Sequence, residues 1–275
     1  MVMTKSFNIG WLTLALTLAV AASSMAMRER MPLPGLLNSV QGHVTLGAHS
    51  VSVTPGSTPN RVLRTHEVLA TQHGNAEVLL TPGAFLRLGH HSAARMVSQS
   101  LEDSQVRLIR GKALLRADSV FKHTLSVVMD GAITRIDQKG LYGFNARRET
   151  IGVLQGKATI YKGGSRFIVK KGHELALSKG QPLYNQKLSK QAFESGQLFR
   201  WSRLRDRYES RARQSVQQAI AQSGRWQGRG WYWSPFWGFY TYLPSEGMYF
   251  SPYYYPYGWD NWGWGGWGGW DDDDD

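Results

Sequence analysis

The 275-residue sequence contains no cysteine, which excludes disulfides, lipid-modified cysteine, cysteine-ligated metals and thiol catalysis. Stability must therefore come from a packed core, which a chain of this length can build without covalent cross-links. Amphipathic patterns with helical spacing are also missing between residues 43 and 184, so a helical bundle is not expected there.

The first 26 residues have the pattern of a signal peptide. Lys5 supplies a positive charge, residues 11–20 form an apolar run, and Ser24-Met25-Ala26 fits the small-residue rule of signal peptidase. We therefore expect cleavage after Ala26 and export to the periplasm or the cell surface of a bacterium. The alternative is an uncleaved membrane anchor, for which the apolar run is short.

Positive charge is missing from the C-terminal part of the chain. Residues 230–275 contain no Lys or Arg and end in five aspartates, whereas residues 27–229 carry 31 Lys and Arg against 13 Asp and Glu. Such a basic exported body fits an envelope protein or an anionic or glycan envelope polymer as partner, with weak membrane association as a further option. Nucleic acid is not expected as a partner, and simple solubility explains the charge equally well.

A short phrase occurs twice in the middle of the chain. Residues 78–88 and 127–136 each alternate apolar side chains around a Pro-Gly or Asp-Gly turn, and a Gly-Lys-Ala strand follows each of them, at Gly111 and Gly156. Both copies read as β-hairpins. A unit of roughly 45–50 residues that occurs twice predicts two layers of one β-domain, since neither copy can bury its apolar face alone. The side chains expected to point inward are Val78, Leu80, Val127 and Met129.

Short strands separated by turn signals predict an all-β domain over residues 41–184, a two-layer sandwich or rolled sheet built from the repeated hairpin unit. Residues 27–40 are expected to form a leader before it. Apolar residues then recur at spacings of three and four from residue 189 to residue 223, which predicts one amphipathic helix. Residues 225–275 are expected to be an aromatic, Gly-rich, low-complexity tail with an acidic end.

The spacing within this helix predicts which of its sides faces the β-domain. One apolar stripe is expected to pack on the β-domain, and it consists of Trp201, Leu204, Tyr208, Ala212, Val216, Ala219 and Ile220. Glu209 is four residues from both Arg205 and Arg213, so we expect these ion pairs on the solvent side.

No set of residues fits a catalytic or metal site. The eight His residues show none of the H-x-H or H-E-x-x-H spacings that metal ligation favours, and adjacent His90 and His91 on a strand would point to opposite faces. There is also no G-x-S-x-G elbow and no phosphate-binding glycine loop. We therefore expect no enzyme activity, no cofactor and no metal.

Nine of the 11 tryptophans lie after residue 225. Such aromatic side chains could stack on sugar rings, lie at a membrane–water interface, or fold back over the β-domain as a clamp, and the sequence leaves these three interpretations open. Burial is the commonest use of aromatic side chains, which favours the clamp. The candidate aromatic surface consists of Trp231, Trp233, Trp237, Tyr240 and Tyr242.

Three segments, residues 76–88, 106–111 and 151–158, carry a family resemblance. The first is an alternating hairpin, the second a V-x-L-x-x-G strand, and the third a closing strand of similar form. Through them residues 41–180 resemble the periplasmic β-domain of the ferric-citrate regulator (FecR) family. Regulators of that family carry a cytoplasmic segment and a membrane span before this domain, whereas few residues precede the apolar run here.

The resemblance therefore implies a free-standing exported FecR-like domain that binds or scaffolds without catalysis, and not an anti-sigma factor. Two alternatives stay open. One is a carbohydrate- or cell-wall-binding adhesion protein that uses the Trp/Tyr tail. The other is a membrane-anchored signal-transduction regulator, which requires that the N-terminal apolar segment remains uncleaved.

Overall fold

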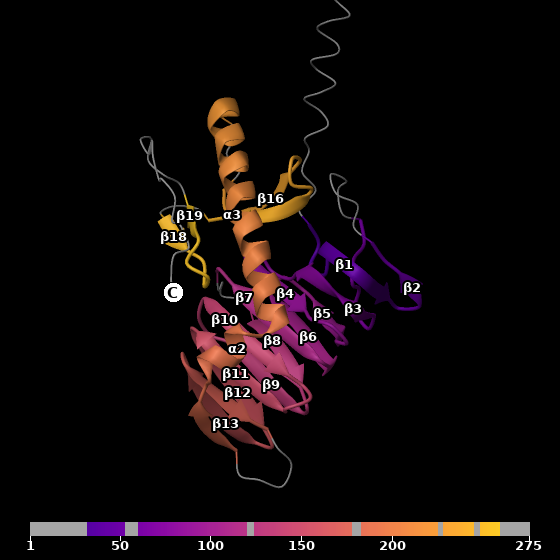
Figure 1. Cartoon of the computed structure of the whole chain (residues 1–275), viewed down its shortest axis with the longest axis vertical. Helices are drawn as coiled ribbons and strands as arrows, with labels where there is room; N and C mark the ends of the chain where they lie inside the picture. Colours follow the sequence, from indigo (N-terminus) through magenta and orange to yellow (C-terminus); the bar gives the residue numbers. More distant parts are fainter. Residues whose placement is uncertain are drawn as a thin grey trace, which may run out of the picture. The chain divides into compact units, whose positions relative to one another are not determined.

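The computed structural model describes residues 32–52, 60–119, 124–177, 183–224, 228–244 and 248–258. The expected signal peptide and the acidic end of the chain lie outside these residues. One 15-stranded sheet dominates the described part of the chain (Figure 1). Its strands are β1 (Leu37–Leu46), β2 (His49–Ser50), β3 (Val68–Leu79), β4 (Ala84–Leu88), β5 (Ala93–Gln99), β6 (Asp103–Arg110), β7 (Lys112–Ala117), β8 (Thr124–Met129), β9 (Ala132–Ile136), β10 (Gly140–Asn145), β11 (Thr150–Gln155), β12 (Lys157–Lys162), β13 (Ser165–Lys170), β14 (His173–Ala176) and β15 (Tyr184–Lys187).

The sheet is rolled, and the long strand β3 forms the bend. The strand order is β13-β12-β9-β8-β6-β5-β3-β4-β7-β10-β11-β14-β15, with β1 also paired to β3, and every pair is antiparallel except β6 with β8. Strand β3 pairs with β5 through residues 68–70 and with β4 through residues 76–79. The inner faces of both sides of the roll meet in one apolar core. The predicted all-β rolled sheet is confirmed.

The repeated phrase appears in space as a repeated arrangement of strands. Hairpin β3–β4 is joined by β7, and hairpin β8–β9 is joined by β12, in each case through the second strand of the hairpin. Each copy also contributes a second hairpin, β5–β6 or β10–β11, to the opposite side of the roll. The repeat is therefore confirmed, but each copy supplies strands to both layers. The four side chains expected to point inward are at most 1% exposed and belong to the core: Val78, Leu80, Val127 and Met129.

The structure places some boundaries differently from the sequence prediction. Strand β1 begins at Leu37, inside the expected leader, because Leu37 is fully buried and pairs with Val78. The expected single helix is two helices, α2 (Lys190–Glu194) and α3 (Gln197–Ser223), separated by the extended backbone of Gly196. Helix α3 ends at Gly224, whose left-handed conformation satisfies the chain reversal that closes a helix.

The aromatic tail contains regular structure after these helices. Its described residues form two hairpins: β16 (Gly230–Ser234) with β17 (Phe239–Leu243), and β18 (Met248–Phe250) with β19 (Pro256–Gly258). Helix α3 contacts both strands of the first hairpin. None of the described helices combines the length and apolar character of a membrane span.

Two glycines mark the points where the chain crosses from one side of the roll to the other. Gly111 joins β6 to β7 with φ +80°, and Gly156 joins β11 to β12 with φ +96°. A Cβ atom on Gly156 would lie 2.7 Å from the carbonyl oxygen of Lys139, and one on Gly111 would lie 2.5 Å from the Cα atom of Ser92. Both corners therefore require glycine, because it adopts a positive φ without strain and because it has no Cβ atom to collide with the neighbouring backbone.

This requirement can be tested with Gly156→Ala and the matched control Gly131→Ala. Gly131 also has a positive φ, +72°, but a Cβ atom there meets nothing within 4 Å. Gly131→Ala should lower the free energy of unfolding by about 1–2 kcal/mol through backbone strain alone. Gly156→Ala should cost about 1–3 kcal/mol more, because overpacking is added to the strain. Urea unfolding measures both, and equal losses would contradict the packed corner.

Candidate functional site

The outer face of strands β3, β4 and β7 carries charged residues that the structure buries. Glu77, Arg87 and Leu114 are direct neighbours across these strands, and Arg116 is the neighbour of Phe85. Helix α3 covers this face and contributes its own charged side chains, at Arg205, Asp206, Glu209 and Arg213. Together with Asp118 these residues form what we call the ion-pair cluster.

Two arginines of the sheet form the centre of the ion-pair cluster. Arg87 contacts Glu77 through Nε at 2.7 Å and Glu209 through Nη2 at 2.7 Å. Arg116 contacts Asp118 and Glu209 through Nη2, each at 2.7 Å. One carboxylate of helix α3 therefore bridges the arginines of two neighbouring strands, and charge-assisted bonds of this kind are the strongest hydrogen bonds in proteins.

The remaining members complete a balanced set of charges. Arg205 Nη2 lies 2.9 Å from Glu77 Oε1, Arg116 also pairs with Asp206, and Arg213 Nη2 lies 3.5 Å from Asp118 Oδ2. Four arginines thus face four carboxylates, and only the Arg205 side chain, at 10%, has more than 1% exposure. These residues correct the expectation that Arg205, Glu209 and Arg213 face solvent.

Three neutral side chains, from α3, β1 and the aromatic tail, also belong to this hydrogen-bond network. Arg87 Nη1 donates to Ser202 Oγ at 2.6 Å, and the Tyr253 hydroxyl donates to the same oxygen. Asn38 of β1 donates to Glu77 Oε1 at 2.9 Å and accepts from the backbone N–H of Tyr240 at 2.8 Å. The cluster therefore connects β1, the sheet, α3 and both parts of the aromatic tail.

Burial and the arginines act in opposite directions on the two glutamates. Burial on its own raises the pKa of Glu77, but Arg205 and Arg87 outweigh it and lower the pKa well below its usual range. Burial raises the pKa of Glu209, and the nearby Glu77 carboxylate adds to this against Arg116 and Arg87. Perturbed carboxyl groups are common in active sites, but these are sealed beneath α3, so a substrate could not reach them. The ion-pair cluster therefore has a structural role: it holds α3 against the sheet.

The five aromatic residues singled out in the sequence fall into two groups. Trp231, Tyr240 and Tyr242 are at most 5% exposed and pack against the sheet, where the Trp231 ring meets Phe85 edge-on at 4.8 Å. Trp233 and Trp237 are half-buried. Folding back over the β-domain therefore describes the first group, and of these five residues only the second group is accessible enough to contribute to an aromatic binding surface.

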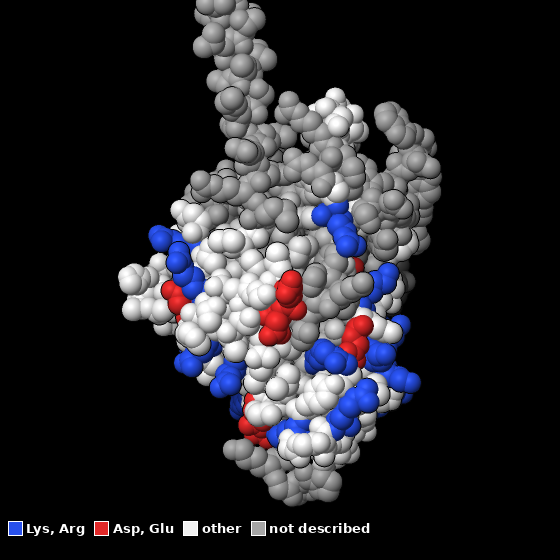
Figure 2. Space-filling model, turned by 180° about the vertical axis from the view of Figure 1, so that it is seen from behind, with Lys and Arg blue, Asp and Glu red and all other residues white. Residues whose placement is uncertain are grey.

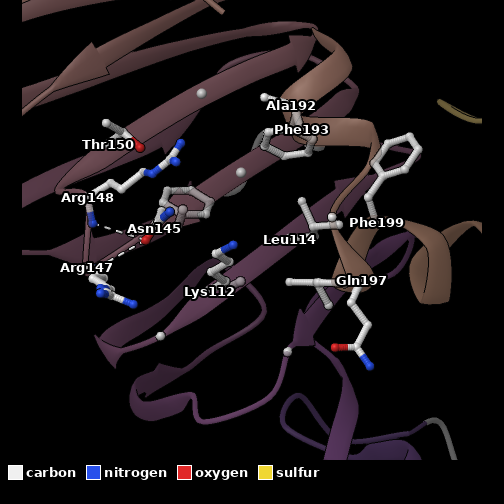
Figure 3. Close-up of a pocket in the computed structure, with 18 of the residues that line it drawn as sticks. Lys112, Leu114, Asn145, Arg147, Arg148, Thr150, Ala192, Phe193, Gln197 and Phe199 are labelled. Atoms are coloured by element: carbon white, nitrogen blue, oxygen red, sulfur yellow. Dashed lines mark hydrogen bonds between the residues drawn. The ribbon is translucent and has the colours of Figure 1, made fainter. Parts of the chain in front are cut away.

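A groove opens beside the ion-pair cluster (Figure 3). It lies between the outer face of β7, β10 and β11 and the residues of α2 and early α3. Its volume is about 450 Å³, within the usual range for ligand sites. The strands leave room because two outward positions are glycines: the Phe193 ring of α2 occupies the place of a Cβ at Gly143, and Leu188 lies close to Gly152.

The groove has an apolar side and a cationic side. Figure 3 shows Leu114, Phe193 and Phe199 on one side and Lys112, Arg147 and Arg148 toward the other. The turn that carries the two arginines is held by the Asn145 Oδ1 atom, which accepts from their backbone N–H groups at 3.2 and 3.1 Å.

One acid lines the groove among the described residues, and it is engaged. Glu174 Oε1 accepts a hydrogen bond from Gln186 Nε2 at 2.8 Å. The first turn of α3, which also lines the groove, has neither a side-chain cap nor an acidic residue, so the positive end of the helix dipole adds to the cationic character. Figure 2 views the molecule from the opposite side to Figure 1, and blue Lys and Arg side chains are spread over that side as well. Sequence reasoning missed this groove, since only the adjacent pair Arg147-Arg148 signalled it.

Comparisons with known proteins give limited similarity. No known protein family matches the chain, and no curated protein matches it either. Two crystal structures of a "putative anti-sigma factor" from Parabacteroides distasonis are similar to it, with 15% and 14% identity and a TM-score of 0.39 in each case. The similarity covers 44% of this chain and 59% of that protein, so the chain spans less than two thirds of its neighbour's length. The FecR resemblance stays an expectation from the sequence.

Substitution of Glu77 tests how much the ion-pair cluster depends on each of its carboxylates. Glu77→Gln removes the carboxylate that pairs with both Arg87 and Arg205 and should lower the free energy of unfolding by about 3–5 kcal/mol at pH 7. The control Glu194→Gln breaks a surface ion pair, in which the partner Lys190 is 3.7 Å away, and should cost less than about 0.5 kcal/mol.

The pH dependence of this difference follows from the lowered pKa. Folding lowers the pKa of Glu77, so its contribution is complete above the unfolded-chain pKa of about 4.3 and is lost as the pH falls below it. The gap between wild type and Glu77→Gln should therefore shrink on acidification by about 1.4 kcal/mol per pH unit. A gap that widens in acid would contradict the ionised, arginine-bound Glu77.

Proposed function

We propose that this chain is a non-catalytic exported envelope protein whose β-domain binds an anionic envelope polymer in the groove beside α2. The observation that carries the proposal is the pairing of an apolar wall with a cationic side in one cavity. Lys112, Arg147 and Arg148 face a single engaged acid there, Glu174. An acidic glycan offers both parts of the complementary surface, carboxylate or phosphate groups and the apolar faces of sugar rings.

The absence of catalysis in this proposal rests on where the acidic groups lie. The carboxyl groups of Glu77 and Glu209 have strongly perturbed pKa values, but both are fully buried and bound to arginines. The groove instead collects cations, which bind and position an anion. A binding or scaffolding role agrees with what the FecR resemblance of the sequence implies.

A second candidate, adhesion to neutral glycans, is favoured by the turn between β16 and β17. Phe236 is 83% exposed there, and its ring meets Trp237 edge-on at 5.4 Å. Trp237 in turn stacks on Tyr208 of α3, with ring centroids 5.6 Å apart. Exposed aromatic rings held in place by their neighbours suit stacking on sugars.

A third candidate, a membrane-anchored regulator, requires that residues 1–26 stay attached. Those residues lie outside the described part of the chain, and the export proposed here requires their removal after Ala26. The intact mass of the protein recovered from bacterial envelopes separates the two: loss of the first 26 residues supports export, and the full mass supports the regulator.

A glycan array that contains acidic and neutral glycans tests the proposed function with the full chain. Arg147→Gln/Arg148→Gln should weaken binding to acidic glycans about tenfold, because charge-assisted hydrogen bonds are lost. The control Arg203→Gln/Arg207→Gln removes the same charge from an exposed side of α3 and should leave binding unchanged. Binding to neutral glycans that is lost with Trp237→Ala, and is unaffected by the groove variant, would favour adhesion and contradict the groove.

A further inference from the structure

One side of the rolled sheet is open in the described part of the chain. The side formed by β3, β4, β7, β10 and β11 carries the ion-pair cluster. It is contacted by α2, α3 and the β16–β17 hairpin. The opposite side, formed by β5, β6, β8, β9, β12 and β13, exposes large apolar side chains: Ile109 45%, Ile133 43%, Ile168 43% and Tyr161 37%. We call the outer surface of these six strands the open face.

Strand register aligns outward-pointing residues, most of them exposed, in a row across the open face. Arg95 pairs with Arg107, Arg107 pairs with Val128, and Val128 pairs with Ile133. Ile133 pairs with Tyr161 and Tyr161 with Arg166, so the row crosses all six strands. Side chains two residues apart share a face of a strand, which places Ile109, Arg135 and Ile168 on the same surface.

Positive charge on the open face exceeds negative charge. Arginines and lysines occupy six of its outward positions: Arg95, Arg107, Arg135, Lys157, Arg166 and Lys170. Two acids share the face, Asp103 and Asp137. Asp137 is already engaged by Arg135 at 3.0 Å and by the Thr159 hydroxyl at 2.6 Å, so most of the positive charge is not compensated.

The uncompensated charge on the open face destabilises the free protein, as Arg95 and Arg107 illustrate. They are exposed and directly opposite each other on neighbouring strands, and like charges in that position are destabilising. Neither has an ion-pair partner among the described residues. An external anion would remove the repulsion.

We propose that the open face binds a lipid bilayer surface that carries anionic head groups. The excess of positive charge indicates a negatively charged partner. The exposed apolar residues indicate that this partner is a lipid surface. Ile109, Ile133 and Ile168 are aliphatic and could bury their side chains among acyl chains, whereas sugar recognition relies on aromatic rings. Tyr161 has the amphipathic ring that is enriched at membrane interfaces, and the surrounding arginines would meet the head groups.

Co-sedimentation of the full chain with vesicles tests this proposal independently of the groove. Binding is expected to phosphatidylglycerol-containing vesicles and to be weaker for vesicles of phosphatidylcholine alone. Arg95→Gln/Arg107→Gln should weaken binding to the anionic vesicles about fivefold for each charge removed. The matched control Arg203→Gln/Arg207→Gln removes two exposed arginines from α3 and should bind as wild type does. All variants keep the same N-terminal segment and aromatic tail, so differences report the open face.

A second variant separates a lipid surface from a soluble anionic polymer. Ile133→Thr/Ile168→Thr keeps β-branched side chains on the strands but removes apolar contact, and it should also weaken binding to anionic vesicles. The proposal is overturned if the arginine variant and its control bind alike. It is overturned equally if the isoleucine variant binds as wild type does and soluble polyglutamate displaces the protein from vesicles, since the partner would then be a polymer. A melting temperature of each variant no lower than that of the wild type establishes that the fold is intact.

Discussion

The contact between Glu209 of helix α3 and the arginines of β4 and β7 is the interaction on which the rest of the structure depends. One carboxylate meets Arg87 and Arg116 at 2.7 Å, inside a cluster of four arginines and four acids. Taking these charges out of water is costly, so the cluster adds little net stability compared with an apolar interface. It does, however, raise the free energy of any other position of the helix, because a shift would leave buried charges without partners. We infer that its role is to fix the position of α3.

Fixing α3 determines the two faces of the molecule. With α3 in place, Phe193 of α2 lies over Gly143, and the groove with its cationic side forms beside α2. The Trp231 and Tyr240 side chains complete the covered side, and the Tyr240 backbone is linked to the cluster through Asn38. Within the part of the chain that the structure describes, the other side of the roll is uncovered and keeps its apolar and basic residues exposed. The groove and the open face are thus both consequences of where one helix is held.

The sequence predicted the sheet well because strand alternation and turn chemistry are local signals. The repeated hairpins, the inward position of Val78 and Val127, and the stop of the helix at Gly224 all follow from residues close in sequence. The ion-pair cluster could not be predicted in this way. Glu77 and Arg87 occupy outward positions of a hairpin, and Glu209 has arginines four residues away on either side, so local rules assign all of them to solvent.

The groove was missed for a related reason, since it is formed by residues from β7, β10, β11 and α2 that no local pattern brings together. The glycines that make room for Phe193 and Leu188 read in the sequence as ordinary strand and turn glycines. For the aromatic tail, the sequence indicated burial as the favoured use, and Trp231, Tyr240 and Tyr242 are buried. Which of its aromatics stay exposed depended on the placement of α3, which supplies Tyr208 as the partner of Trp237.

Native-state hydrogen exchange of the full chain tests the central claim that α3 and the aromatic hairpin are locked to the sheet. If the ion-pair cluster fixes them, backbone amides of α3 between Arg205 and Val216, and those of β16 and β17, should exchange only through the same global unfolding as β4 and β7. Exchange of α3 through a separate opening of lower free energy, while β4 and β7 stay protected, would contradict the account.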